Sequence, residues 1–172
     1  LLRISTIAAA ALTPDEVLRQ LTTEAGKMMR ADLGLALVYD ANTRLLVPLR
    51  LASFGELPDN VLDFRLDTTH PAFHRSVFKT RQVFRTHDAL HDQRVIGLYR
   101  PFVERFQVRA LLAAPLVIRD EALGEIYMAK RTTEPFTAGD EQRLTTVLPF
   151  LADAIVNARL TADRERRLQQ LS

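Results

Sequence analysis

The sequence predicts an α+β fold: an antiparallel five- or six-stranded sheet with helices packed on it, including long N- and C-terminal helices. Three observations predict this fold, namely two hairpin patterns, amphipathic helical patterns that flank them, and an irregular middle segment at residues 54–107. Hairpin strands pair antiparallel, and an amphipathic helix can bury its apolar face against such a sheet. The length of 172 residues suffices for one domain with its own core, so we expect a single domain over residues 1–172.

Two helical patterns open the chain. Apolar side chains recur at helical spacing through residues 1–12, which predicts an N-terminal helix there. The run Thr13–Glu16 then supplies an N-cap threonine, a proline at the first helical position and the glutamate of a capping box. The helix that starts at Pro14 carries apolar residues on one face, and we expect it to end near Arg30–Asp32.

A first hairpin is predicted over Leu35–Ser53. Leu35–Tyr39 is a short apolar run rich in β-forming residues, Asp40–Thr43 has the composition of a turn, and Arg44–Ser53 alternates apolar with polar side chains. Pro48 has no N–H group to donate across a ladder, so the second strand should lie at an edge of the sheet or bulge at this residue.

A second hairpin and a long helix close the chain. Val108–Ile118 is apolar, a short polar turn follows, and Gly124–Lys130 returns as a strand. Thr137 can cap the next helix because Asp140 stands three residues later. The apolar stripe of this helix thins toward its end, and we expect residues 160–172 to form an exit helix.

The composition excludes several classes of protein. The absence of cysteine excludes disulfide scaffolds, thiolate zinc sites and a covalently attached bilin chromophore. The longest apolar run, Ala110–Ile118, is half of a membrane span, so we expect no membrane contact by this segment. The net charge is +2, and the scattered arginines form no motif for nucleic-acid recognition. We find no glycine-rich phosphate loop, nucleophile elbow or convincing carboxylate pair, so no enzyme activity is predicted.

All four histidines lie in the middle segment, at His70, His74, His87 and His91. A helix that starts near Pro71 would place His70 and His74 on one face, because they are four residues apart. Such a pair could bind a metal or haem, or it could face solvent or hydrogen-bond locally. No carboxylate motif accompanies the pair, and no His-Pro run precedes Val108, so we predict no metal site and regard haem as disfavoured.

The middle segment is also basic and aromatic. Between Arg65 and Arg109 there are nine basic and four acidic residues. Arginine binds phosphate or carboxylate through two parallel hydrogen bonds, so this charge favours an anionic ligand; the alternative is that the arginines only solvate the surface. Five aromatic residues could line a pocket for a planar ring or form the apolar underside of short helices: Phe73, Phe84, Tyr99, Phe102 and Phe106.

The last third of the chain resembles a known family. Four runs resemble the late hairpin and final helix of GAF domains: Ala114–Ile118, Leu123–Met128, Phe136–Glu141 and Leu151–Leu160. Leu12–Leu18 is similar to the helix that opens these domains. The resemblance implies a cytoplasmic regulatory sensor domain of a signal-transduction protein, with a small ligand bound between the sheet and the middle segment. The alternative is a dimerisation or interaction module of the same fold that binds no ligand.

The same resemblance implies partners for the terminal helices. In this family these helices commonly pack against a second copy in a homodimer and pass a signal to an output domain in the same chain. Residues 160–172 resemble the linkers that precede histidine kinase or diguanylate cyclase modules. Leu160, Leu168 and Leu171 form a narrow apolar strip on the exit helix, and they are the predicted dimer seam.

The candidate site residues come from these residue types and from the resemblance. The predicted ligand-binding residues are His70, Phe73, His74, Arg85, Tyr99, Phe102 and Arg109. Cyclic-nucleotide-binding members of the family carry an Asn-Lys…Phe…Asp-Glu pattern, which this chain matches at Lys130, Phe136, Asp140 and Glu141. Ala129 takes the place of the asparagine, so the ligand or cofactor stays unidentified, with a cyclic nucleotide still open. Lys130 and Asp140 are predicted to form a structural ion pair that joins the last strand to the last helix.

Overall fold

The computed structural model describes residues 12–171, so the helix predicted over residues 1–12 falls almost entirely outside the described range. The helices are α2 (Pro14–Met28), α3 (Val77–Thr80), α4 (Arg100–Phe106) and α5 (Ala138–Leu171). The strands are β1 (Leu33–Asp40), β2 (Leu45–Gly55), β3 (Leu66–Asp67), β4 (Phe84–Thr86), β5 (Ala110–Ile118) and β6 (Glu121–Lys130). Two short 3₁₀ helices, Val61–Asp63 and Phe73–Arg75, lie in the middle segment.

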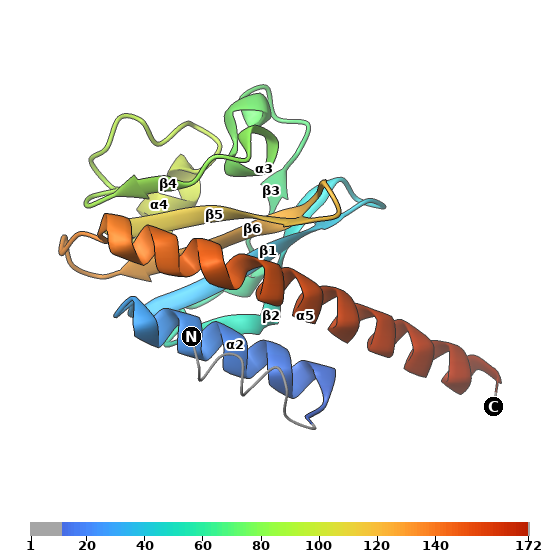
Figure 1. Cartoon of the computed structure of the whole chain (residues 1–172). Helices are drawn as coiled ribbons and strands as arrows, with labels where there is room; N and C mark the ends of the chain where they lie inside the picture. The colour runs from blue at the N-terminus through green and yellow to red at the C-terminus, as the bar shows by residue number, and fades with distance from the viewer. Residues whose placement is uncertain (1–11, 172) are drawn as a thin grey trace.

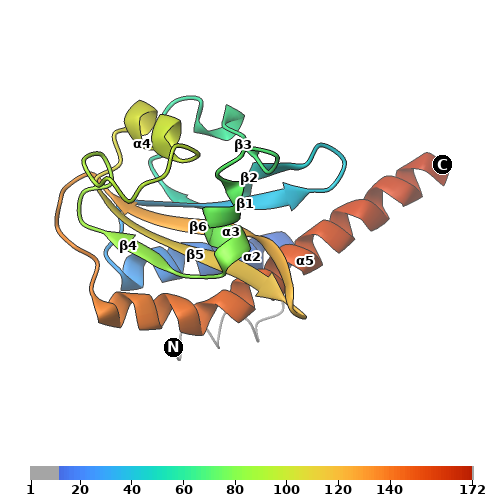
Figure 2. The same cartoon turned by 90° about the horizontal axis from the view of Figure 1, so that it is seen from above.

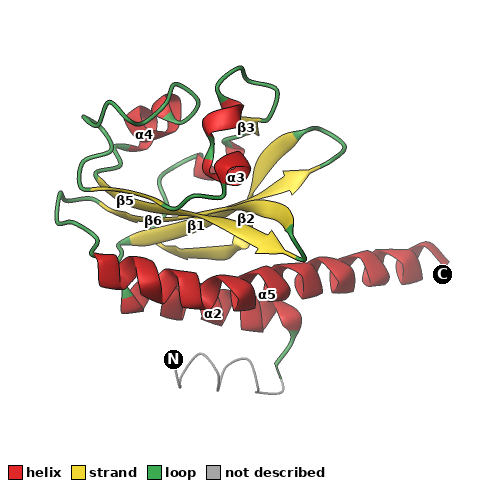
Figure 3. Ribbon diagram, turned by 45° about the horizontal axis from the view of Figure 1, so that its top comes forward, coloured by secondary structure: helices red, strands yellow, loops and turns green. Residues whose placement is uncertain are grey.

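The strands form one antiparallel sheet in the order β3-β2-β1-β6-β5-β4. Helices α2 and α5 cover one face of this sheet, and the middle segment with α3 and α4 covers the other (Figures 1 and 3). Side chains alternate along the central strand β6: Ile126 and Met128 pack toward the two long helices, whereas Tyr127 packs toward the middle segment. The arrangement confirms the predicted α+β fold with its antiparallel six-stranded sheet.

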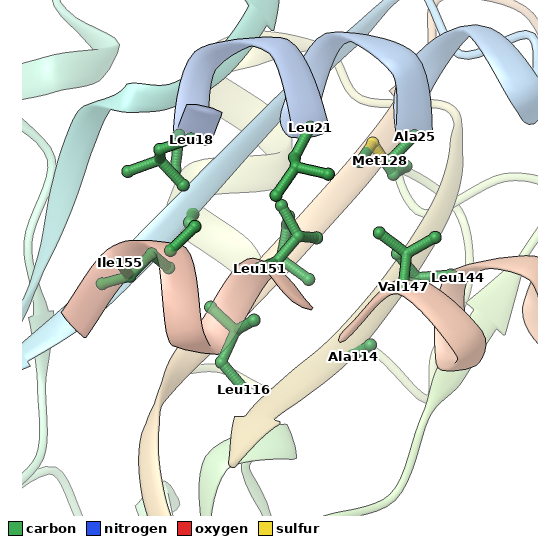
Figure 4. Packing of buried hydrophobic residues seen from close by; sticks show 14 of the residues in the cluster. Leu18, Leu21, Ala25, Ala114, Leu116, Met128, Leu144, Val147, Leu151 and Ile155 are labelled. Carbon is green, nitrogen blue, oxygen red and sulfur yellow. The ribbon is translucent and has the colours of Figure 1, made fainter. Parts of the chain in front are cut away.

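One apolar cluster joins the two long helices to the sheet. Leu18 and Leu21 of α2 and Leu151 of α5 are no more than 1% exposed, and they pack near Leu116 of β5 (Figure 4). Burying one leucine side chain stabilises a fold by about 1.5–3 kcal/mol. The first half of α5 is therefore held firmly on the sheet, opposite the middle segment.

Both predicted capping boxes are present. The Thr13 hydroxyl accepts a hydrogen bond from the Glu16 N–H at 3.2 Å, and the Glu16 carboxylate accepts one from the Thr13 N–H. At α5, the Asp140 N–H donates to the Thr137 hydroxyl at 3.1 Å and the Thr137 N–H donates to the Asp140 carboxylate at 2.8 Å. These local bonds fix where α2 and α5 begin; α2 ends at Met28, slightly before the predicted boundary.

Pro48 lies where the sequence predicts, on an unpaired stretch of strand edge. β3 pairs only with Leu45 and Leu46 of β2, so on its outer side Pro48 has no neighbouring strand among the described residues. On the inner side, the register of β1 and β2 shifts between Leu35 and Ala36, where β2 bulges. A residue without an N–H group is tolerated beside such an open edge.

The helix predicted to start near Pro71 is wrong. Only a 3₁₀ turn, Phe73–Arg75, forms there, and His70 lies before it in a turn. The turn ends at Ser76, whose hydroxyl accepts a hydrogen bond from the Lys79 N–H and thereby starts the separate helix α3. The four-residue spacing of the two histidines consequently does not place them together on one helix face.

The second half of α5 projects past the sheet (Figure 3). The helix is continuous through Pro149 and ends at Leu171. Its terminal leucines are exposed, with Leu160 at 57%, Leu168 at 61% and Leu171 at 85%. No helix within residues 12–171 is long and apolar enough to cross a membrane.

Candidate ligand-binding site

A cleft of about 230 Å³ lies between the sheet and the middle segment. Leu111 and Ala113 of β5 and Tyr127 of β6 form its sheet side. The middle segment supplies the other walls, from α3, from the start of β4 and from the stretch between Arg94 and Tyr99. Because most of these side chains are apolar, the cleft favours a ligand with an apolar body.

Two arginines stand among the polar residues of the cleft. The Arg94 guanidinium pairs with the Asp92 carboxylate at 2.7 Å and lies over the Phe84 ring at 5.1 Å. These hydrogen bonds hold the pKa of Asp92 well below its usual range, so the acid stays ionised and balances the charge of Arg94. Arg75 is exposed, and its guanidinium makes no hydrogen bond or ion pair with any residue in the described range 12–171. Arg75 is therefore the cation that is free to meet a ligand.

A buried carboxylate lies next to the cleft. Glu125 of β6 is fully buried, and its Oε2 accepts hydrogen bonds from the Phe78 N–H and the Tyr99 hydroxyl, each at 2.7 Å. The Tyr127 hydroxyl donates to the other oxygen, Oε1. Burial raises the pKa of Glu125 above its ordinary value, and the three donors offset part of that effect. Three hydrogen bonds thus satisfy a group that would be costly to bury alone.

The same group of side chains caps α3. A helix leaves its first N–H groups without partners inside the helix. Here the Val77 N–H donates to the Tyr99 hydroxyl at 3.1 Å, the Phe78 N–H to Glu125, and the Lys79 N–H to the Ser76 hydroxyl at 3.1 Å. The short helix is therefore tied to the sheet by polar side chains.

Of the seven predicted ligand-binding residues, only Tyr99 lines this cleft. Phe73 and Phe102 are buried in the core between the sheet and the middle segment, at 4% and 7% exposed. His70 and His74 are exposed, and each has its Nδ1 hydrogen-bonded locally, to the Ala72 N–H and the Pro71 carbonyl group respectively. The structure therefore does not gather the predicted set around one pocket.

Most arginines of the middle segment hold loops together. Arg109 forms a two-bond pair with Asp88, at 2.9 and 3.1 Å, which helps to lower the pKa of that carboxyl to about 2. Arg100 donates to four main-chain carbonyl groups, and Arg85 donates to the Phe136 carbonyl at 2.8 Å. The arginines of this segment that were expected to meet an anion are thus largely paired inside the protein, and of the two arginines that line the cleft only Arg75 keeps its guanidinium unpaired within residues 12–171.

The predicted ion pair between Lys130 and Asp140 does not form. Asp140 pairs with Arg143 at 2.8 Å, because the capping box turns its carboxylate toward the first turn of α5. Lys130 is 5% exposed, and its Nζ lies 4.7 Å from the centre of the Phe136 ring. A cation–π contact therefore joins the end of β6 to Phe136 in the segment that leads into α5, in place of the predicted ion pair.

The sequence analysis does not select Glu125 or Tyr127 as site residues. A usable signal was present, since Glu125 is an acid inside the otherwise uncharged run Gly124–Ala129 of a predicted buried strand. A buried acid requires partners, and alternation places Tyr127 on the same face of β6. Within residues 12–171, no group of three or more metal-binding side chains is placed to hold an ion.

The fold and the cleft together define a single-sheet α+β domain with space for a small molecule on one face. The model of the GAF domain family matches residues 13–155, and the chain belongs to this family of sensor and regulatory modules in signalling proteins. Comparison with curated proteins by sequence gives no match. The family assignment is consistent with a regulatory role for the domain and no enzymatic one.

Solved structures support the same fold. The GAF domain of a phosphoenolpyruvate-protein phosphotransferase from Coxiella burnetii is 19% identical with a TM-score of 0.72, and the match covers 94% of this chain and 93% of that one. A methyl-accepting chemotaxis protein fragment is 19% identical with a TM-score of 0.65, covering 92% and 97%. A phycocyanobilin-bound GAF domain from a cyanobacterial phytochrome is 14% identical with a TM-score of 0.72, covering 92% and 93%.

Proposed function

We propose that this domain is a sensor that binds a compact amphipathic anion in the cleft and transmits its occupancy through α5. The observation that carries the proposal is the cleft itself, with apolar walls and an unpaired arginine beside them. Its volume of about 230 Å³ is below the roughly 300–1,000 Å³ of pockets for drug-sized ligands, which favours a small aromatic acid. A cyclic nucleotide stays open as a larger anion, whereas covalent attachment of a bilin through a thioether requires a cysteine that this chain lacks.

The charge around the cleft favours an acid over an amine. Arg94 is balanced by Asp92, and Glu125 lies behind the tyrosines with all its hydrogen bonds made inside the protein. Arg75 remains to bind a carboxylate, for which the two N–H groups of a guanidinium are well matched. An aromatic or aliphatic acid would then place its apolar body between the tyrosines and β5.

The sheet provides the route from the cleft to α5. Leu111 and Ala113 line the cleft, whereas Leu112 on the opposite face of β5 belongs to the core that contains Leu151 of α5. Only one strand therefore separates the ligand from the signalling helix. A ligand can shift the position of α5 only by its different affinity for two arrangements of this strand and helix.

We further propose a homodimer through α5 and an output domain beyond it in a cytoplasmic protein of histidine kinase or diguanylate cyclase type. The four exposed large apolar residues of the described chain all lie on this helix: Phe150, Leu160, Leu168 and Leu171. At 100° per residue, they fall within about 80° of one another around the helix axis. One exposed apolar face on a projecting helix favours packing against a second copy of the same helix.

Thermal shift with matched ligands tests the binding proposal. Indole-3-acetate should raise the Tm by several degrees at millimolar concentration, whereas tryptamine, which carries the same ring with the opposite charge, should not. Ile96→Trp should abolish the rise, because Ile96 lines the cleft and the larger ring fills it. Cyclic GMP serves as the larger anion in the same series.

Leu62→Trp is the matched control for this experiment. Leu62 is half-buried against the same core as Ile96 but does not line the cleft, so this variant should keep the response of the unmodified domain. Equal responses to the acid and the amine, or equal responses of the two variants, would contradict the proposal. No response to any of these compounds from a tight dimer would instead favour the interaction module without a ligand.

A further inference from the structure

Glu125 is a point where three separate parts of the chain meet. Its carboxylate accepts hydrogen bonds from the main chain of α3, from Tyr99 just before α4, and from Tyr127 on its own strand. α3 lies across the middle of the sheet, above the strand that carries Glu125 (Figure 2). The fully buried Glu125 is therefore used to hold the middle segment, not to meet solvent.

The hydrogen bonds also determine what the cleft offers to a ligand. Tyr99 and Tyr127 both line the cleft, and both of their hydroxyl groups donate to Glu125, which does not line it. Burial raises the pKa values of both tyrosines, so their hydroxyl groups stay protonated and remain donors. With these hydroxyl groups already engaged, the tyrosines present mainly ring surface to the cleft.

We propose that Glu125 is the positioning residue that closes the cleft, by fastening α3 and Tyr99 to β6 and by keeping both tyrosine hydroxyl groups away from the ligand. The attachment of α3 and Tyr99 to β6 can be measured without a ligand. Only the effect of this attachment on ligand affinity rests on the proposed sensor function. Loss of the side chain would leave the Phe78 N–H and two hydroxyl groups without their acceptor, which is costly for buried groups.

A glutamine at this position can form hydrogen bonds with the same three partners as Glu125. Its amide oxygen can accept from the Phe78 N–H and the Tyr99 hydroxyl, and its NH₂ group can donate to the Tyr127 hydroxyl oxygen. Alanine can form none of these bonds. Glu125→Gln is therefore the conservative variant that should restore the hydrogen bonds that Glu125→Ala loses. If the position required a negative charge instead, Glu125→Gln would behave like Glu125→Ala.

Amide hydrogen exchange in the ligand-free domain tests the proposal residue by residue. Glu125→Ala should speed exchange of the Phe78 amide at least about 10-fold, and Glu125→Gln should keep it near the rate of the unmodified domain. The amide of Leu21, in α2 on the other face of the sheet, should be unchanged in both variants. A Phe78 rate within about twofold of the unmodified domain in Glu125→Ala, or equal acceleration in both variants, would overturn the proposal.

A second variant covers the case in which Glu125→Ala does not fold. Tyr99→Phe removes one hydroxyl group, so the Val77 amide loses its acceptor while the Phe78 amide keeps Glu125. Exchange at Val77 should accelerate more than exchange at Phe78, and the reverse order would overturn the proposal. Affinity for indole-3-acetate should fall in Glu125→Ala and persist in Glu125→Gln. If the unmodified domain does not bind indole-3-acetate, the sensor proposal fails, but the exchange rates still test whether Glu125 fastens α3 to β6.

Discussion

Gly124→Ala should lower the Tm of this domain by about 10 °C, a large stability change for the addition of one methyl group. Gly124 pairs with Val38 of β1 on one side and with Leu116 of β5 on the other. A Cβ at this position would stand 2.1 Å from the Leu37 carbonyl oxygen and 3.0 Å from the Val38 Cα. Both are backbone atoms of a central strand, so relief requires the pairing of β1 and β6 to open.

Overpacking of this kind costs about 3 kcal/mol, which in a domain of this size corresponds to the stated change in Tm. Because Gly124 directly precedes Glu125, displacement of β6 should also loosen the cleft. Gly97→Ala is the control: a Cβ at Gly97 would meet nothing within 4 Å, so calorimetry should find its Tm nearly unchanged. Equal melting temperatures for the two variants would contradict the strand pairing described here.

The second large effect concerns assembly. The double variant Leu160→Asp with Leu168→Asp should weaken dimerisation at least about 1,000-fold and shift the sedimentation profile to monomer. In a symmetric dimer it removes four leucines, each worth about 1.5 kcal/mol or more when buried, and adds like charges at the same place. The stability of the monomer should change little, because both leucines are more than half exposed.

A matched variant separates the apolar face from the added charge. Ala162→Asp with Gln169→Asp adds the same two negative charges about 180° around the helix from Leu160, so the dimer should persist. A monomeric profile for the unmodified domain at 100 µM, or a dimer that survives the leucine substitutions, would remove α5 as the dimer seam.

The parts of the fold that follow local rules could be predicted from the sequence. The Thr13 and Thr137 capping boxes need only residues three positions apart, and both helices begin where these residues stand. The hairpins follow from alternation and turn composition, and Pro48 marks an open edge by its missing N–H. Each of these signals is contained within a few neighbouring residues, so no knowledge of tertiary packing is required.

The site could be predicted only in part, because its contacts join residues far apart in the chain. Tyr99 was identifiable as an aromatic residue of the middle segment, but its acceptor Glu125 lies 26 residues away. The sequence analysis pairs Asp140 with Lys130, but the geometry of the capping box turns the Asp140 carboxylate toward Arg143. Arg109 was predicted to bind an anionic ligand, but its guanidinium pairs with Asp88, which lies 21 residues earlier in the chain.

Methyl-resolved NMR titration with indole-3-acetate tests the central claim most directly, because it locates the bound ligand. The account predicts that the methyl signals of Val77, Val83, Ile96 and Ala113, which all surround the cleft, shift together and saturate with one affinity. Shifts confined to methyl groups elsewhere, for example along the projecting half of α5, or an absence of shifts at millimolar ligand, would contradict a sensor that binds a small acid in this cleft.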